Sequence, residues 1–149
     1  MAMTDDEYIR VRAFLQQARM KDSAIKRKQL QIRELESCLL PGAIRYDVDR
    51  VQSSPSDPMS RIMAEIDDLE HQIEQLKIEK AEAVTEVSRM IDKLEDETEK
   101  TVLAEYFIGR APMTEVADII GYGVRQAFRI RKRGIENVAE LLKDVSECQ

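Results

Sequence analysis

Five basic side chains follow a glycine-containing turn in the last third of the chain, and they suit binding to a negatively charged polymer. No acidic residue lies between Gly121 and Gly134, although the chain of 149 residues has a net charge of −6. The five are Arg125, Arg129, Arg131, Lys132 and Arg133. Concentrated positive charge on an acidic protein predicts a focused contact with nucleic acid rather than a non-specific coat.

The side chains of this stretch divide into two chemical groups. The candidate DNA contacts are Arg125, Gln126, Arg129, Lys132, Arg133 and Thr114. The first three would read bases, because arginine pairs bidentately with guanine and glutamine with adenine in the major groove. The last three would hold phosphates, with Thr114 acting from a helix N-terminus.

Residues 113–133 predict two short helices joined by a tight turn, which would position these side chains. The apolar face of the first helix is expected to comprise Val116, Ala117, Ile119 and Ile120. Gly121-Tyr122-Gly123 then interrupts it, because glycine tolerates positive φ angles. The second helix should begin near Val124 and place Ala127, Ile130 and Gly134 opposite the arginines. This spacing is typical of a helix-turn-helix.

Residues 99–142 resemble the sigma-factor region-four-like helix-turn-helix of the ArpU-type phage transcriptional regulators. The resemblance rests on Leu103, Tyr106-Phe107, Val116-Ala117 and the run from Gly121 to Ile130, and it extends to the linker motif at 51–55 and the long helices around it. That family usually has serine at the position of Gly123 and a larger aliphatic residue at that of Ala127. The resemblance implies regulation of phage or prophage genes in a bacterial cell.

Long helices are predicted on both sides of a linker at residues 41–57. Thr4 and Glu7 form a capping box that should begin a helix running to about Leu40, with an interrupted apolar seam. Asp57-Pro58 should begin a helix over 58–95. Its apolar residues recur every three or four positions, as in a coiled coil. The candidate interface residues are Ile62, Ile66, Leu69, Ile73, Leu76, Val87 and Leu94.

We therefore expect an all-α protein with two parts. Residues 1–95 would form a long helical hairpin or coiled-coil stalk, and residues 96–149 a helix-turn-helix domain. Asp96 with Glu99 should cap a helix over 97–108. An amphipathic helix should continue from Ile135 nearly to the C-terminus.

The composition argues against other classes of protein. Charged residues make up 35% of the chain and aromatic residues 5%, as in long charged helices. We expect no enzyme activity, no cofactor and no metal, because the sequence shows no nucleophile–base pair and no ligand spacing. His71, the sole histidine, should be solvated. No signal peptide or membrane span is predicted, and Cys38 and Cys148 read as reduced thiols of a cytoplasmic protein.

The expected partners are double-stranded DNA and a second copy of the chain, and contact with RNA polymerase is left open. The apolar stripe over 58–95 exceeds what the poorer first seam can cover, which favours a homodimer. The alternative function is a coiled-coil adaptor that binds proteins such as RNA polymerase, with the basic helix merely a solvated face. Binding to DNA at moderate salt separates the two.

Overall fold

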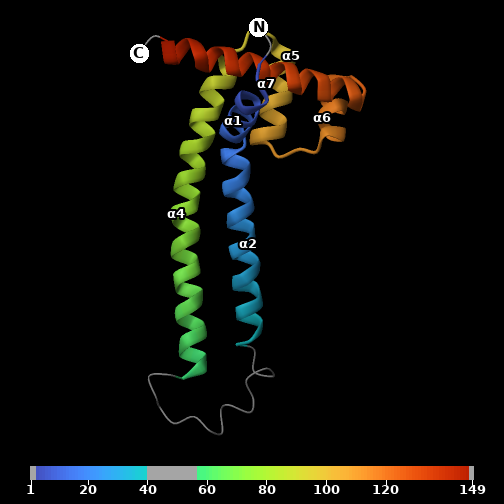
Figure 1. Ribbon diagram of the computed structural model, residues 1–149. Helices are drawn as coiled ribbons and strands as arrows, with labels where there is room; N and C mark the ends of the chain where they lie inside the picture. Colours follow the sequence, from blue (N-terminus) through green and yellow to red (C-terminus); the bar gives the residue numbers. More distant parts are fainter. Residues whose placement is uncertain (1–2, 40–56, 148–149) are drawn as a thin grey trace. The chain divides into compact units, whose positions relative to one another are not determined.

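Every regular element in the described part of the chain is helical, which confirms the all-α class. The computed structural model describes residues 3–39 and 57–147. The elements are α1 (Asp5–Leu15), α2 (Gln17–Ser37), α4 (Pro58–Asp92), α5 (Glu97–Leu103), the π-helical turn η1 (Ala104–Ile108), α6 (Met113–Ile120) and α7 (Val124–Glu147) (Figure 1). None of the helices in these ranges is long and apolar enough to cross a membrane.

Three helix starts follow the capping residues of the sequence. Thr4 accepts a hydrogen bond from the Glu7 amide, and the Glu7 carboxylate accepts one from the Thr4 amide, so the capping box is confirmed. The Asp57 carboxylate accepts from the Met59 amide at 3.2 Å at the start of α4. Asp96 caps α5 by accepting from two backbone amides. Most of the linker at 41–57 lies outside the described residues.

The first long helix is interrupted, so the prediction of one continuous helix from Thr4 to about Leu40 is wrong. α1 ends at Leu15 and α2 begins at Gln17. The side-chain amide of Gln17 donates to the Phe14 carbonyl at 2.9 Å. This side-chain hydrogen bond competes with the backbone hydrogen bonds of a regular helix. The helix also ends early, at Ser37, while Leu40 and Pro41 lie outside the described residues.

The second long helix also ends earlier than expected. α4 stops at Asp92 rather than 95, and the amides of Lys93 and Leu94 donate to carbonyls three residues earlier, those of Met90 and Ile91. This tighter turn closes the helix and keeps Leu94 buried.

Contacts divide the chain into two units. One contains the described residues up to Met20 together with those from Lys80 onward, and the other runs from Lys21 to Glu79. The domain boundary predicted from the sequence, between residues 95 and 96, stays a prediction. Both α2 and α4 contribute residues to each unit.

In the unit from Lys21 to Glu79, parts of α2 and α4 lie side by side and antiparallel (Figure 1). The ammonium group of Lys21 lies 3.2 Å from the Glu79 carboxylate, and that of Lys28 donates to the Gln72 side chain at 2.6 Å. In the same unit, Ile25, Leu69 and Ile73 are buried. This pairing inside one chain covers part of the apolar seam.

The seven candidate coiled-coil positions differ in burial within this single chain. Those buried are Leu69, Ile73, Val87 and Leu94, and those only partly buried are Ile62, Ile66 and Leu76. Their role between two chains stays a prediction.

Ile73→Val should lower the free energy of unfolding by about 0.5–1.5 kcal/mol, because it removes a buried methylene from the seam. Ile78→Val is the matched control on the same helix, since Ile78 is 56% exposed, and its effect should stay within about 0.5 kcal/mol. Urea denaturation followed by circular dichroism measures both. Equal effects of the two substitutions would refute the seam assignment.

In the other unit, α7 packs against α1, α5 and α6 (Figure 1). The larger apolar core joins residues of α1, the end of α4, α5, η1 and α7, among them Leu15, Val87, Leu103, Phe107 and Ile135. A second core joins α5, α6 and the start of α7: Val102, Ala111, Met113, Val116, Ala117, Ala127 and Ile130. The two cores fix α7 on both sides.

Two local features bring α5 and α7 close together. A Cβ atom at Gly134 would lie 3.1 Å from a methyl group of the buried Leu103, so glycine permits the contact between the two helices. The helix predicted over 97–108 widens into the π-helical turn η1 over its last five residues. Phe107 of this turn is fully buried, whereas Tyr106 is only partly buried.

Candidate nucleic-acid interface

The turn between α6 and α7 depends on one glycine. Gly121 has φ of +76°, the left-handed conformation that glycine adopts without strain. Its amide and that of Tyr122 donate to the Ala117 carbonyl at 3.0 and 3.1 Å. Gly123 has no positive φ and open space around it, so glycine is not required there. α7 then begins at Val124, as predicted.

Small and aliphatic side chains hold α6 against α7. Ala117, Ala127 and Ile130 are almost completely buried, as their spacing predicts. Ile119 differs from expectation: it is 48% exposed, so the prediction that it belongs to the buried apolar face is wrong. Val116 and Ala117 fill the contact with α7, and Ile119 lies on the other side of this short helix.

The six candidate DNA contacts occupy different environments. Arg125, Arg129 and Lys132 are exposed on the side of α7 opposite Ala127 and Ile130. Helical periodicity puts these three on one face, because they are separated by four and three residues.

The other three candidates lie outside this common face. Gln126 is partly buried, and Arg133 lies on the same flank as Gln126, seven residues or about two helical turns further on. Thr114 is exposed in the first turn of α6, where no side chain caps the helix. The structure therefore gathers three of the six on one surface, which we call the basic face: Arg125, Arg129 and Lys132.

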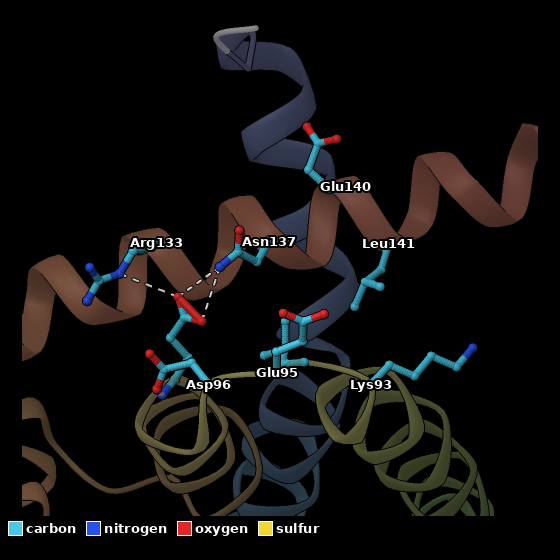
Figure 2. A pocket seen from close by; sticks show the side chains of 9 residues that line it. Lys93, Glu95, Asp96, Arg133, Asn137, Glu140 and Leu141 are labelled. Carbon is cyan, nitrogen blue, oxygen red and sulfur yellow. Dashed lines mark hydrogen bonds and ion pairs between the residues drawn. The ribbon is translucent and has the colours of Figure 1, made fainter.

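Arg133 contacts a buried carboxylate. Its Nε atom lies 3.4 Å from Glu99, whose side chain is 3% exposed. Asn137 donates to both oxygens of the same carboxylate, at 2.8 and 3.1 Å (Figure 2). The sequence predicted that Glu99 and Asp96 together cap α5. Asp96 caps alone, because the Glu99 side chain faces α7 instead.

An open pocket of about 360 Å³ borders this contact (Figure 2). Lys93, Glu95 and Asp96 come from the connection between α4 and α5, and Arg133, Asn137 and Glu140 come from α7. The pocket is rich in carboxylates, which would repel phosphates. This side of α7, which packs on α5, is therefore less suited to a polyanion than the basic face.

Replacing Asn137 with alanine should lower the free energy of unfolding by about 1–3 kcal/mol, because the buried Glu99 carboxylate loses two hydrogen bonds. Glu140→Ala, an exposed substitution one helical turn later, is the control and should change it by about 0.5 kcal/mol or less. Thermal or urea denaturation measures both. If Asn137→Ala unfolds like the parent chain, Glu99 does not hold α7 on α5.

Arg131 is a member of the basic stretch whose structural role was not foreseen. It is partly buried, and its guanidinium lies 4.7 Å from the ring centroids of both Tyr106 and Phe128. Arg19 lies 4.2 Å from the Tyr106 ring and donates to the Tyr106 carbonyl at 2.6 Å. The spacing of Phe128 and Arg131 hints at their contact, but no sequence pattern links either to Tyr106.

Acidic residues approach one end of the basic face. Asp5, Lys132 and Glu136 line the same surface hollow, together with Met3 and Tyr8. Positive charge is therefore least compensated at the beginning of α7, around Arg125 and Arg129.

His71 is exposed, as expected, and its Nδ1 donates to the Asp67 carbonyl at 2.8 Å. This hydrogen bond and the nearby Asp67 carboxylate raise the pKa of His71. Cys38 is an exposed free thiol, and Cys148 lies outside the described residues. Within 3–39 and 57–147, no cluster of three potential ligands could hold a metal ion.

No family model matches this chain, and neither does any curated protein or solved structure.

Proposed function

We propose that this protein is a sequence-specific DNA-binding transcriptional regulator in which α6, the Gly121 turn and α7 act as a helix-turn-helix. The observation that carries the proposal is the basic face of α7, Arg125, Arg129 and Lys132, directly after a left-handed glycine turn and opposite a buried alanine–isoleucine contact. An exposed basic helix start of this kind suits entry into the major groove.

Within this proposal, Arg125 and Arg129 read bases and Lys132 binds a phosphate. The N-terminal turns of a recognition helix enter the groove most deeply, and Lys132 lies about two turns further along. Gln126 would read a base beside the two arginines, and Arg133 and Thr114 would contact the DNA backbone. The resemblance to ArpU-type regulators adds phage or prophage genes in a bacterial cytoplasm as the proposed setting.

The test of function is a titration of duplex DNA with the full-length chain, after selection of preferred sites from a random library. Lys132→Ala should weaken binding to all sequences alike and reduce the steepness of the salt dependence by about one unit. A chain that binds no duplex above the non-specific level would contradict the proposal. The coiled-coil adaptor, acting for instance on RNA polymerase, would then be the better account.

We also propose that the protein binds DNA as a homodimer. The supporting observation is that Ile62, Ile66 and Leu76 of the seam are only partly buried in the single chain. A dimer would present two recognition helices about 34 Å apart, one turn of DNA. Light scattering at micromolar concentration tests this. The mass of a monomer would contradict the homodimer, and each DNA site would then bind a single recognition helix.

A further inference from the structure

Two apolar side chains lie at the beginning of α7 without entering the core. Val124 and Phe128 are 40% and 43% exposed, although both residue types are usually buried. They are four residues apart and therefore occupy one side of the helix over its first two turns. The contact with α6 is supplied instead by Ala127 and Ile130. Val124 and Phe128 are therefore not needed for packing between α6 and α7.

The Phe128 ring is held in place by its neighbours. The Arg131 guanidinium stacks 4.7 Å from the ring centroid and lies equally close to Tyr106. These cation–π contacts restrict the side-chain rotamers of Phe128 before any partner binds. A preorganised apolar group at the surface is suited to a specific contact.

The surroundings of these two side chains indicate what they contact. Arg125 and Arg129 alternate with them along the helix, so apolar and cationic groups form adjacent strips. An apolar protein surface would leave both guanidinium groups without acceptors. The major groove offers both chemistries, since guanine presents two acceptors and thymine presents a 5-methyl group.

We propose that Val124 and Phe128 contact thymine methyl groups beside the guanines that Arg125 and Arg129 read. This inference rests on the proposed function and refines it, because the preferred site would combine guanine with thymine. Gln126, partly buried on another flank of α7, would contribute less to the base preference than these apolar residues.

The experiment uses the full-length chain and the duplex obtained by site selection. Each thymine in turn is replaced by deoxyuridine, which pairs identically but lacks the methyl group. We expect one or two positions at which the parent chain binds about fourfold more weakly, as for loss of one buried methyl. Phe128→Ala or Val124→Ala should bind the thymine duplex more weakly and show no further loss with deoxyuridine.

Ile119→Ala is the matched control, because Ile119 is an exposed apolar residue of α6 outside these strips. Its affinity should still fall about fourfold when the contacted thymine is replaced by deoxyuridine. Circular dichroism of each variant verifies that the helices are kept, as expected for exposed positions.

Three outcomes would overturn the inference while leaving DNA binding intact. These are a selected site without a preferred thymine, equal affinity for every deoxyuridine duplex, and a penalty that persists in both Val124→Ala and Phe128→Ala. Absence of any preferred duplex would overturn the proposed function itself and this inference with it.

Discussion

Replacing both Arg125 and Arg129 with alanine is expected to reduce the free energy of binding to the preferred duplex by about 2–6 kcal/mol. Each arginine is exposed on the basic face and can form a bidentate pair with guanine, and each such pair contributes about 1–3 kcal/mol of discrimination. The variant should retain non-specific affinity through its remaining phosphate contacts. Fluorescence anisotropy titrations with the selected duplex and a scrambled duplex, at one fixed salt concentration, measure the difference.

The control for this prediction must change the net charge equally. Arg27→Ala with Arg33→Ala removes two exposed positive charges from α2 and should leave sequence preference unchanged. Equal losses in the two double variants would mean that long-range charge alone governs binding. A uniform loss on both duplexes, found only in the Arg125/Arg129 variant, would mean that α7 docks in another orientation.

Phe107→Ala should lower the free energy of unfolding by about 3–5 kcal/mol. The ring is fully buried in the core that joins α1, α4, α5 and α7, and it meets the Tyr106 ring edge-on at a centroid distance of 4.8 Å. Since the free energy of unfolding of a whole domain is only about 5–15 kcal/mol, this variant should unfold at a much lower temperature than the parent chain.

Phe128→Ala provides the same substitution at an exposed site. It loses only a partly exposed stacking contact with Arg131, so its unfolding free energy should change by about 1 kcal/mol or less. Urea denaturation of both variants gives the comparison. Comparable losses would show that Phe107 does not anchor the core.

The sequence by itself determined the features that depend on neighbouring residues. Thr4, Asp57 and Asp96 cap helices because their side chains reach amides two or three positions along. Gly121 makes its turn because only the local backbone conformation matters there. The all-α class, the start of α7 at Val124 and the burial of Ala127 and Ile130 follow equally from spacing along one helix.

Tertiary structure decided the contacts between residues far apart in the chain. Glu99 and Asn137 are 38 positions apart, and Arg19 and Tyr106 are 87 apart, so no local pattern encodes either hydrogen bond. The break at Gln16 and the outward position of Ile119 likewise depart from the periodicity of their helices. Periodicity states which side of a helix is apolar, but the neighbouring helices determine which positions on that side are covered and which charged groups find partners.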